Sequence, residues 1–161
     1  MRLPLPALAE RWGDNLYRVA FSICKNRQDA EDAVQDTLLA YHLADREFES
    51  EQHIRAWLIR VAVNKAKNAT LCFWHRNRRA LEDYADSLAF EMPEDRELFD
   101  AVMRLHEKYR IVIHLFYYED YSIREIAEVL GTGEGTVKSR LSRARKQLKA
   151  QLTEGWRDDE S

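Results

Sequence analysis

Hydrophobic positions recur at helical spacing along nearly the whole chain. Between Asp14 and Leu130 the sequence contains no glycine, and its only proline in that span is Pro93. No stretch shows the sustained alternation of apolar and polar residues that is typical of strands. Because glycine and proline are the residues that most often interrupt helices, this pattern predicts long helices and an all-α fold.

The first half of the chain carries apolar stripes that predict three helices. The first helix covers Trp12–Lys25 and ends in a turn at Asn26–Gln28. The second begins at Asp29, and the third runs from about Ile54 to Phe73 after a loop at Phe48–His53. The expected core positions are Leu16, Val19, Ala20 and Ile23 in the first helix, Ala30, Ala33, Val34, Thr37, Leu38 and Tyr41 in the second, and Ile54, Trp57, Leu58, Val61 and Ala62 in the third.

The apolar stripe of the third helix continues onto Lys65 and Asn68, where a core helix would carry apolar residues. Either the helix has run past its core, or polar groups are needed at these positions. The sequence leaves both readings open.

The second half predicts helices at Leu98–His106 and Arg110–Glu119, which would pack under a helix-turn-helix. The stretch between the two halves is acidic and contains Pro93. We therefore expect two small helical domains, residues 1–80 and 94–161, joined by an acidic linker at residues 81–93.

The segment Tyr121–Leu148 has the pattern of a helix-turn-helix. Ser122 is a candidate N-cap, and Glu125 completes a capping box. An apolar stripe follows, and Gly131 is placed to end the first helix in the left-handed conformation. Gly133 and Gly135 are expected in the turn, with a second helix from about Thr136. The stripe of the first helix is Ile123, Ile126, Ala127 and Leu130.

The second helix of this motif is basic on one side. Its expected buried face is Val137, Leu141, Ala144 and Leu148. In a helix-turn-helix the second helix enters the major groove, where Arg and Lys reach guanine and Ser serves either base partner. The alternative is a solvated amphipathic helix of an ordinary bundle. The candidate DNA-binding residues are Lys138, Ser139, Arg140, Ser142, Arg143 and Lys146.

Charge is unevenly distributed along the 161 residues, although the net charge is only −3. The segment from Gln52 to Leu81 contains Arg and Lys but no Asp or Glu, whereas the segment from Asp29 to Glu51 is strongly acidic. Such alternation is expected where one surface meets phosphate and another meets a basic protein. Trp74 and His75 lie within the acid-free segment, as in single-stranded nucleic-acid sites, although core packing is the alternative for each ring.

The same reasoning leaves little support for an enzyme or a metalloprotein. Cys24 and Cys72 stand far apart, and no metal-binding motif or phosphate-binding loop is present, so no cofactor is expected. His106 and Glu107 begin like a zinc-binding HExxH motif, but Arg110 replaces the second His. The first residues lack the pattern of a secretion signal, and no apolar run is long enough to cross a membrane, so we expect a cytoplasmic protein without direct membrane insertion.

Several segments together resemble one known family. The order DAEDAVQDTLLAY, FESEQHIRAWLIRVAVNKAKN, KYRIVIHLFYYEDYSIREIAEVLG and GTVKSRLSRARKQL is similar to bacterial RNA polymerase sigma factors of the extracytoplasmic-function (ECF) group. The likeness extends from Leu16 to Leu148. It implies two helical domains, region 2 and region 4, joined by a flexible linker, and a role in directing core RNA polymerase to promoter DNA.

The resemblance also implies a role for each candidate residue. The second helix would dock on the clamp helices of polymerase through Asp32, Gln35, Asp36 and Leu39, a face that is otherwise simply solvated. The segment Phe48–Arg55 would capture a base flipped from the minus-10 element, and the basic helix would bind the minus-35 element. The candidate minus-10 residues are Phe48, Arg55, Asn64, Lys65 and Asn68.

The chain also departs from the family pattern. His106 stands where the family often has proline, and the turn at residues 132–134 lacks the usual apolar residue and proline, which predicts looser docking on the flap of polymerase. An anti-sigma factor is a further expected partner. The rival interpretation is a stand-alone helix-turn-helix regulator that binds an operator as a dimer.

Overall fold

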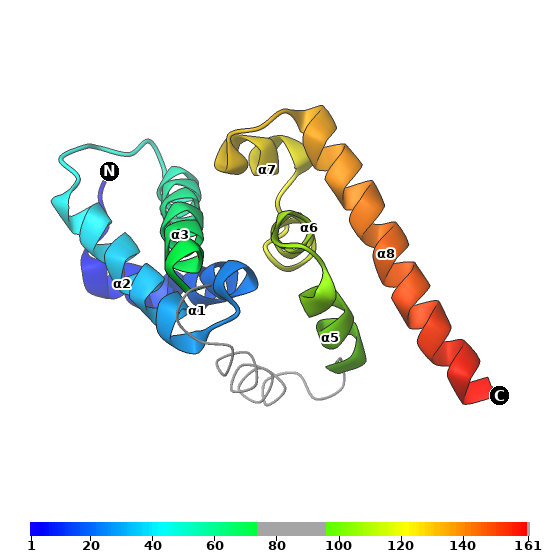
Figure 1. Cartoon of the computed structure of the whole chain (residues 1–161). Coiled ribbons are helices and arrows are strands. Elements are labelled where there is room, and N and C mark those ends of the chain that lie inside the picture. The colour runs from blue at the N-terminus through cyan, green and yellow to red at the C-terminus, as the bar shows by residue number, and fades with distance from the viewer. Residues whose placement is uncertain (74–95, 161) are drawn as a thin grey trace. The chain divides into compact units, whose positions relative to one another are not determined.

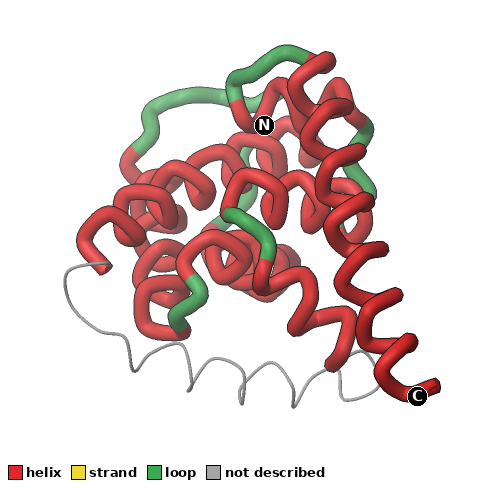
Figure 2. Tube along the Cα trace, turned by 45° about the vertical axis from the view of Figure 1, so that its right-hand side comes forward, coloured by secondary structure: helices red, strands yellow, loops and turns green. Residues whose placement is uncertain are grey.

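The computed structural model describes residues 1–73 and 96–160, and within these ranges the regular elements are all helices. The side chains described are those of residues 1–69 and 98–152. The helices form two units, residues 1–81 and 82–161 (Figures 1 and 2). The all-α prediction is confirmed, whereas the predicted linker at residues 81–93 lies outside the described residues.

The first unit packs α1 (Leu5–Cys24), α2 (Arg27–Leu43) and α3 (Glu51–Phe73) against one another, so that each helix contacts both others. Figure 1 shows the three helices crossing around a shared core. The fully buried side chains include many of the predicted ones: Leu16, Val19, Ala20, Ile23, Ala30, Ala33, Thr37, Tyr41, Ile54, Leu58 and Ala62.

The first helix begins at Leu5 rather than at the predicted Trp12. Pro4 occupies the N-cap, and its carbonyl oxygen accepts bonds from Ala7 and Leu8. Pro6 lies in the first turn, where a fixed φ and a missing amide hydrogen cost nothing. The side chain of Leu8 is fully buried, so the extra turns add to the core.

Side-chain caps also start α2 and α3 earlier than predicted. Asn26 Oδ1 accepts a hydrogen bond from Asp29 N at 3.0 Å, which places Arg27 and Gln28 in the helix instead of a turn. Ser50 Oγ accepts from His53 N at 3.1 Å, so the predicted loop at Phe48–His53 is too long by the first turn of α3. Capping by short polar side chains explains both differences.

The apolar stripe of α3 turns away from the predicted course after Ala62. Ala66 is buried, whereas Lys65 and Asn68 are exposed. The two polar residues therefore lie beside the stripe and not on it. Of the two readings that the sequence left open, neither is needed, because the core continues through Val63 and Ala66.

The second unit contains α5 (Arg96–Arg104), α6 (Glu107–Ile113), a π-helical turn η2 (His114–Tyr118), α7 (Ile123–Leu130) and α8 (Glu134–Glu160). Helices α5, α6 and α7 each pack on α8. The buried side chains of α8 are the predicted Val137, Leu141 and Ala144, with Leu148 half-buried.

The predicted helix Arg110–Glu119 is instead the end of α6 followed by η2. His106 caps α6, since its Nδ1 accepts a hydrogen bond from Lys108 N at 3.2 Å. In η2 the amide of Glu119 donates to His114 O at 3.2 Å, and the two side chains meet at 3.3 Å between His114 Nε2 and Glu119 Oε1. Both side chains are buried, so this polar pair is part of the core.

The helix-turn-helix follows the sequence closely. Glu125 N donates to Ser122 Oγ and Ser122 N donates to Glu125 Oε1, both at 3.1 Å, which confirms the capping box. Gly131 ends α7 at φ 65°, a conformation that favours glycine. The second helix begins at Glu134, two residues before the predicted start, so Gly135 lies in its first turn and not in the loop.

We expect Ser122→Ala to lower the free energy of unfolding by about 1 kcal/mol, because it removes one acceptor of the capping box. Chemical denaturation of the full chain measures this loss. Ser142→Ala is the matched control: Ser142 is exposed within α8 and should tolerate alanine without loss. Equal destabilisation by both substitutions would contradict the capping role.

Candidate nucleic-acid and partner-protein surfaces

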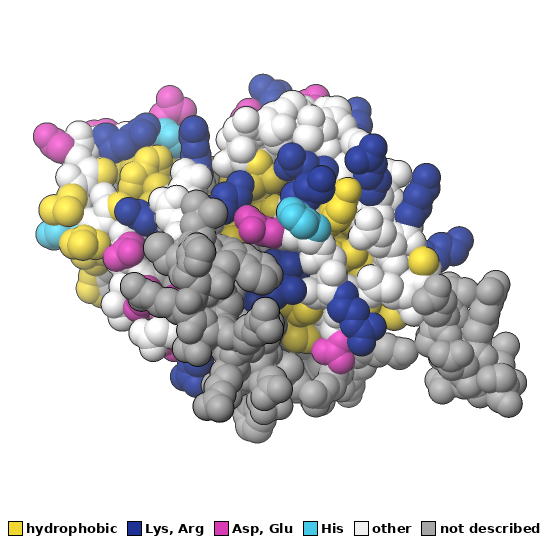
Figure 3. All heavy atoms as spheres, in the orientation of Figure 1, with side chains coloured by type: hydrophobic (Ala, Val, Ile, Leu, Met, Phe, Trp, Pro, Cys, Tyr) yellow, Lys and Arg dark blue, Asp and Glu magenta, His cyan; other side chains and the backbone are white. Residues whose placement is uncertain are grey.

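The outer side of α8 carries a row of exposed cations and hydroxyls. Lys138, Ser139, Ser142, Arg143 and Lys146 are all exposed. Arg140 is half-buried at the edge of the row. Figure 3 shows Lys and Arg side chains spaced along this helix. Because the opposite face of α8 is fixed in the core, these side chains project together from one rigid surface.

Not every cation of α8 belongs to this row. Arg145 Nε donates a hydrogen bond to Tyr117 Oη at 2.8 Å, and its guanidinium lies over the rings of Phe116 and Tyr117 at 5.4 and 5.6 Å. Arg145 is therefore a tie between α8 and η2. Periodicity placed Arg145 beside the apolar stripe but gave no signal for this partner, which is 28 residues away in sequence.

The outer face of α2 is acidic and apolar together. Asp32, Gln35, Asp36 and Leu39 are exposed, as predicted, and Gln28 Nε2 donates to Asp32 Oδ1 at 3.4 Å. Leu39 is 54% and Leu43 71% exposed. Exposed leucines beside carboxylates are typical of a protein-binding surface, where apolar contact adds to charge complementarity. Near the start of α2, a hydrogen bond and the charge of Glu31 raise the pKa of Arg27.

The loop between α2 and α3 is held by an aromatic cluster. The ring of Phe48 stacks on Tyr41 at 5.6 Å and meets Trp57 edge-on at 5.7 Å, while Arg46 lies over it at 5.0 Å. Phe48 is only 3% exposed. The predicted contact of its ring with DNA does not fit this burial, because the ring would have to leave the core. Phe48 supports the loop instead.

The other candidate minus-10 residues lie on α3. Asn64, Lys65 and Asn68 are exposed, and Arg55 is half-buried. Their spacing along one helix brings amide and cationic side chains to one stretch of surface. Trp74 and His75, the predicted stacking rings, lie outside the described residues.

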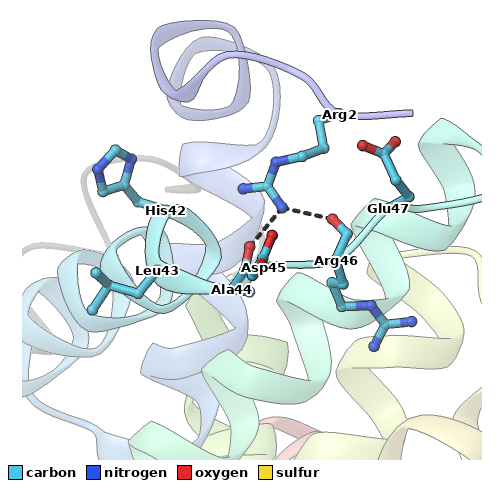
Figure 4. Close-up of a pocket in the computed structure, with 7 residues that line it drawn as sticks. All are labelled: Arg2, His42, Leu43, Ala44, Asp45, Arg46 and Glu47. Atoms are coloured by element: carbon cyan, nitrogen blue, oxygen red, sulfur yellow. Dashed lines mark hydrogen bonds between the residues drawn. The ribbon is translucent and has the colours of Figure 1, made fainter.

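A polar cleft of about 420 Å³ opens beside the loop (Figure 4). Its lining residues are Arg2, His42, Leu43, Ala44, Asp45, Arg46 and Glu47. The ammonium of Met1 donates a hydrogen bond to Glu47 Oε2, and this bond, reinforced by charge attraction, lowers the pKa of the Glu47 carboxyl. The sequence gave no reason to assign Arg2 to this site.

The described residues contain no group of three His, Cys, Asp or Glu side chains placed to hold a metal ion. Within the same part of the chain, no helix has the length and apolar character needed to cross a bilayer. The free thiol of Cys24 is buried, with its Sγ 3.5 Å from Ala66 O. The chemistry of the described surfaces is therefore that of charge, hydrogen bonding and apolar contact.

A helix-turn-helix with a cationic outer face, carried on the same chain as a separate helical unit with an acidic face, defines a DNA-binding protein with a second, protein-directed surface. Comparison with known families agrees. Residues 8–80 match sigma-70 region 2, and residues 95–148 match sigma-70 region 4. The chain belongs to the sigma-70 family of transcription initiation factors, in its ECF group.

Named relatives support this assignment. RNA polymerase sigma factor SigV of Bacillus subtilis is 31% identical over 145 residues, covering 86% of this chain and 85% of the relative. ECF sigma factor SigM of Mycobacterium tuberculosis is 32% identical over 150 residues, covering 91% and 76%. Sigma factors are DNA-binding initiation factors and not enzymes, and this chain is a sigma factor for promoter-directed transcription initiation.

Solved structures give the same result. The sigma factor RpoE of Bartonella quintana, in complex with the anti-sigma factor NepR, has a TM-score of 0.66 at 26% identity, with 92% of this chain and 96% of that one covered. CnrH, in complex with the cytosolic domain of CnrY, has a TM-score of 0.67 at 30% identity, with 92% and 87% covered. The match to region 2 disfavours a stand-alone regulator, which would have no use for the first unit.

The contacts of Arg145 predict a difference between neighbouring cations of α8. Arg145→Ala should lower the free energy of unfolding by about 1 kcal/mol, since it removes a hydrogen bond and a cation–π contact. Arg143→Ala should leave stability nearly unchanged, because Arg143 is exposed on the outer row. Denaturant unfolding of the two variants compares them, and equal losses would show that Arg145 is not a structural tie.

Proposed function

We propose that this sigma factor binds core RNA polymerase through its first unit and flap contacts through its second, and holds promoter DNA at two elements. Residues 1–80 serve polymerase docking and minus-10 recognition, residues 94–161 serve minus-35 recognition, and residues 81–93 join them. The observation that carries the proposal is that one chain has an acidic, leucine-bearing outer face on α2 and a cationic outer face on α8.

The α2 surface is the proposed docking site for the clamp helices of polymerase. Asp32 and Asp36 supply negative charge, Gln35 supplies an amide, and Leu39 supplies apolar area. Burying an exposed leucine at an interface contributes the hydrophobic stabilisation that solvent-exposed ion pairs lack. The carboxylates then set the orientation of a basic partner.

The α8 surface is the proposed reader of the minus-35 element. Arg143, Lys138 and Lys146 are long enough to reach phosphates or guanine edges, and Ser139 and Ser142 reach shorter distances. Arg140, at the margin of the row, is suited to a backbone contact. Arg145 is excluded from this role because it is held by Tyr117.

The minus-10 element is proposed to meet the α2–α3 loop and α3. Asn64, Lys65 and Asn68 supply exposed donors, and Arg55 a partly buried one. The polar cleft beside the loop offers room for a base outside its stack. Contacts to unstacked bases and phosphates would offset the few kcal/mol, on the order of 2–3, that unstacking a base costs. Strand separation then needs no catalytic residue and no cofactor, and polymerase performs the synthesis.

The proposed setting is the cytoplasm, where polymerase and promoter DNA meet. An anti-sigma factor is a further proposed partner, since two structurally similar chains were solved in complexes, RpoE with an anti-sigma factor and CnrH with a cytosolic domain. Its binding surfaces would overlap the exposed faces of α2 and α8, because masking these faces would block both polymerase and DNA.

Run-off transcription with purified core polymerase tests the proposal. Adding the protein should give transcripts from specific members of a randomised promoter library. The isolated protein should show no tight, specific shift of the same DNA, whereas the holoenzyme should. Absence of specific transcripts despite confirmed binding to core would overturn the proposal, and tight operator binding by the protein alone would favour the dimeric regulator.

Arg143→Ala should reduce transcription from promoters that depend on the minus-35 element by about tenfold, since a lost base or phosphate contact removes 1–3 kcal/mol. Affinity for core polymerase should be unchanged, because Arg143 lies on α8 and not on the docking face of α2. Core affinity is measured by fluorescence anisotropy alongside the transcription assay. An equal loss of core binding would mean that Arg143 has a structural role.

A further inference from the structure

The first residues of the chain lie along the loop that joins α2 to α3. Phe48 N donates to Met1 O at 3.0 Å, so the backbone of the N-terminal segment (Met1–Leu3) pairs with the end of the loop. Leu3 pairs with α2: its amide donates to Tyr41 Oη at 2.9 Å, and its carbonyl accepts from the same hydroxyl at 3.0 Å. The loop is thus attached to the start of the chain as well as to its own helices.

Arg2 provides the densest part of this attachment. Its Nη1 donates to Ala44 O and Arg46 O, and its Nη2 donates to Tyr41 O, each at 2.8 Å. Figure 4 shows the guanidinium pointing to the loop backbone, with the bonds to Ala44 and Arg46 drawn. Its carbon also lies 4.5 Å from the centre of the Tyr41 ring.

The chemistry of this contact suits arginine in particular. The carbonyls at the C-terminal end of a helix lack intrahelical donors and carry partial negative charge. A guanidinium presents several donors in one plane and can serve separate carbonyls at once, whereas a lysine ammonium is a single point of charge. Arg2 therefore caps α2 and fixes the first residues of the loop in the same interaction.

Fixing the loop matters because Asp45, Arg46 and Glu47 line the cleft beside it. A loop that is ordered before binding does not lose conformational freedom when it meets a ligand, and its affinity rises accordingly. Phe48 anchors one end of the loop in the core, and Arg2 anchors the other at Ala44 and Arg46.

We propose that Arg2 is a positioning residue for minus-10 recognition, which holds the α2–α3 loop in the conformation that receives the unstacked base. The inference rests on the proposed function, and it assigns to the N-terminal segment a role in promoter selectivity. Arg2 acts through the loop backbone, so the effect of its loss is confined to steps in which the loop contacts DNA.

The test compares Arg2→Ala, Arg2→Lys and Arg11→Ala in reconstituted holoenzyme. Arg11 forms an ion pair with Glu51 at 2.6 Å, so Arg11→Ala removes another arginine from the same unit without touching the loop carbonyls. Three quantities are measured: affinity for core, opening of the minus-10 region by 2-aminopurine fluorescence, and the preference for the wild-type minus-10 sequence over single-base variants. Hydrogen exchange at the Phe48 amide reports the loop in the free protein.

For Arg2→Ala we expect promoter opening and minus-10 preference to fall about tenfold, as the loss of charge-assisted hydrogen bonds predicts. Core affinity should stay within about twofold, which is the scale of a surface change. Exchange at Phe48 should accelerate. Arg2→Lys should recover part of the preference, and Arg11→Ala should match the wild type.

Other results would overturn the inference. Wild-type selectivity in Arg2→Ala would show that the loop is ordered without this contact. Parallel losses of core affinity, minus-35 use and opening, or the same losses in Arg11→Ala, would show a general effect on folding. If the wild-type holoenzyme itself fails to open promoters, the proposed function fails first, and exchange at Phe48 still shows whether Arg2 orders the loop.

Discussion

The order of the α2–α3 loop depends on the side chain of Tyr41. Its ring is buried between Phe48 and Trp57, and the guanidinium of Arg2 lies over it. Its hydroxyl is both donor and acceptor to the backbone of Leu3. One residue thus joins the N-terminal segment, α2, the loop and α3. Because a phenol can stack and form hydrogen bonds at once, it fills a core position and satisfies nearby backbone groups together.

The sequence predicts well the features that neighbouring residues determine. The capping box of Ser122 and Glu125, the end of α7 at Gly131 and the buried face of α8 all depend on residues within a turn or two of each other. The early start of α1 was missed because Gly13 weakens the helical pattern, and only the burial of Leu8 shows that the helix extends before it.

The candidate surfaces were harder to predict, because contacts between distant residues decide which side chains remain exposed. Arg143 and Arg145 are both cations of α8, yet one faces solvent and the other is held by Tyr117. Phe48 resembles a stacking residue in sequence, but Tyr41 and Trp57 bury it. Arg2 has no periodic signal, since it precedes the first helix and its partners are backbone oxygens of the loop.

The π-helical turn η2 has a consequence for the direction of the helix-turn-helix. A π-turn contains one residue more than the α-helical turn it replaces. Deleting one residue between His114 and Tyr118 would restore regular winding and rotate everything after it by about 100° about the helix axis. The buried pair of His114 and Glu119 would separate, and α7 would leave η2 at another angle. The length of this segment is therefore as strictly constrained as its sequence, so single-residue insertions and deletions should be rare there in related chains.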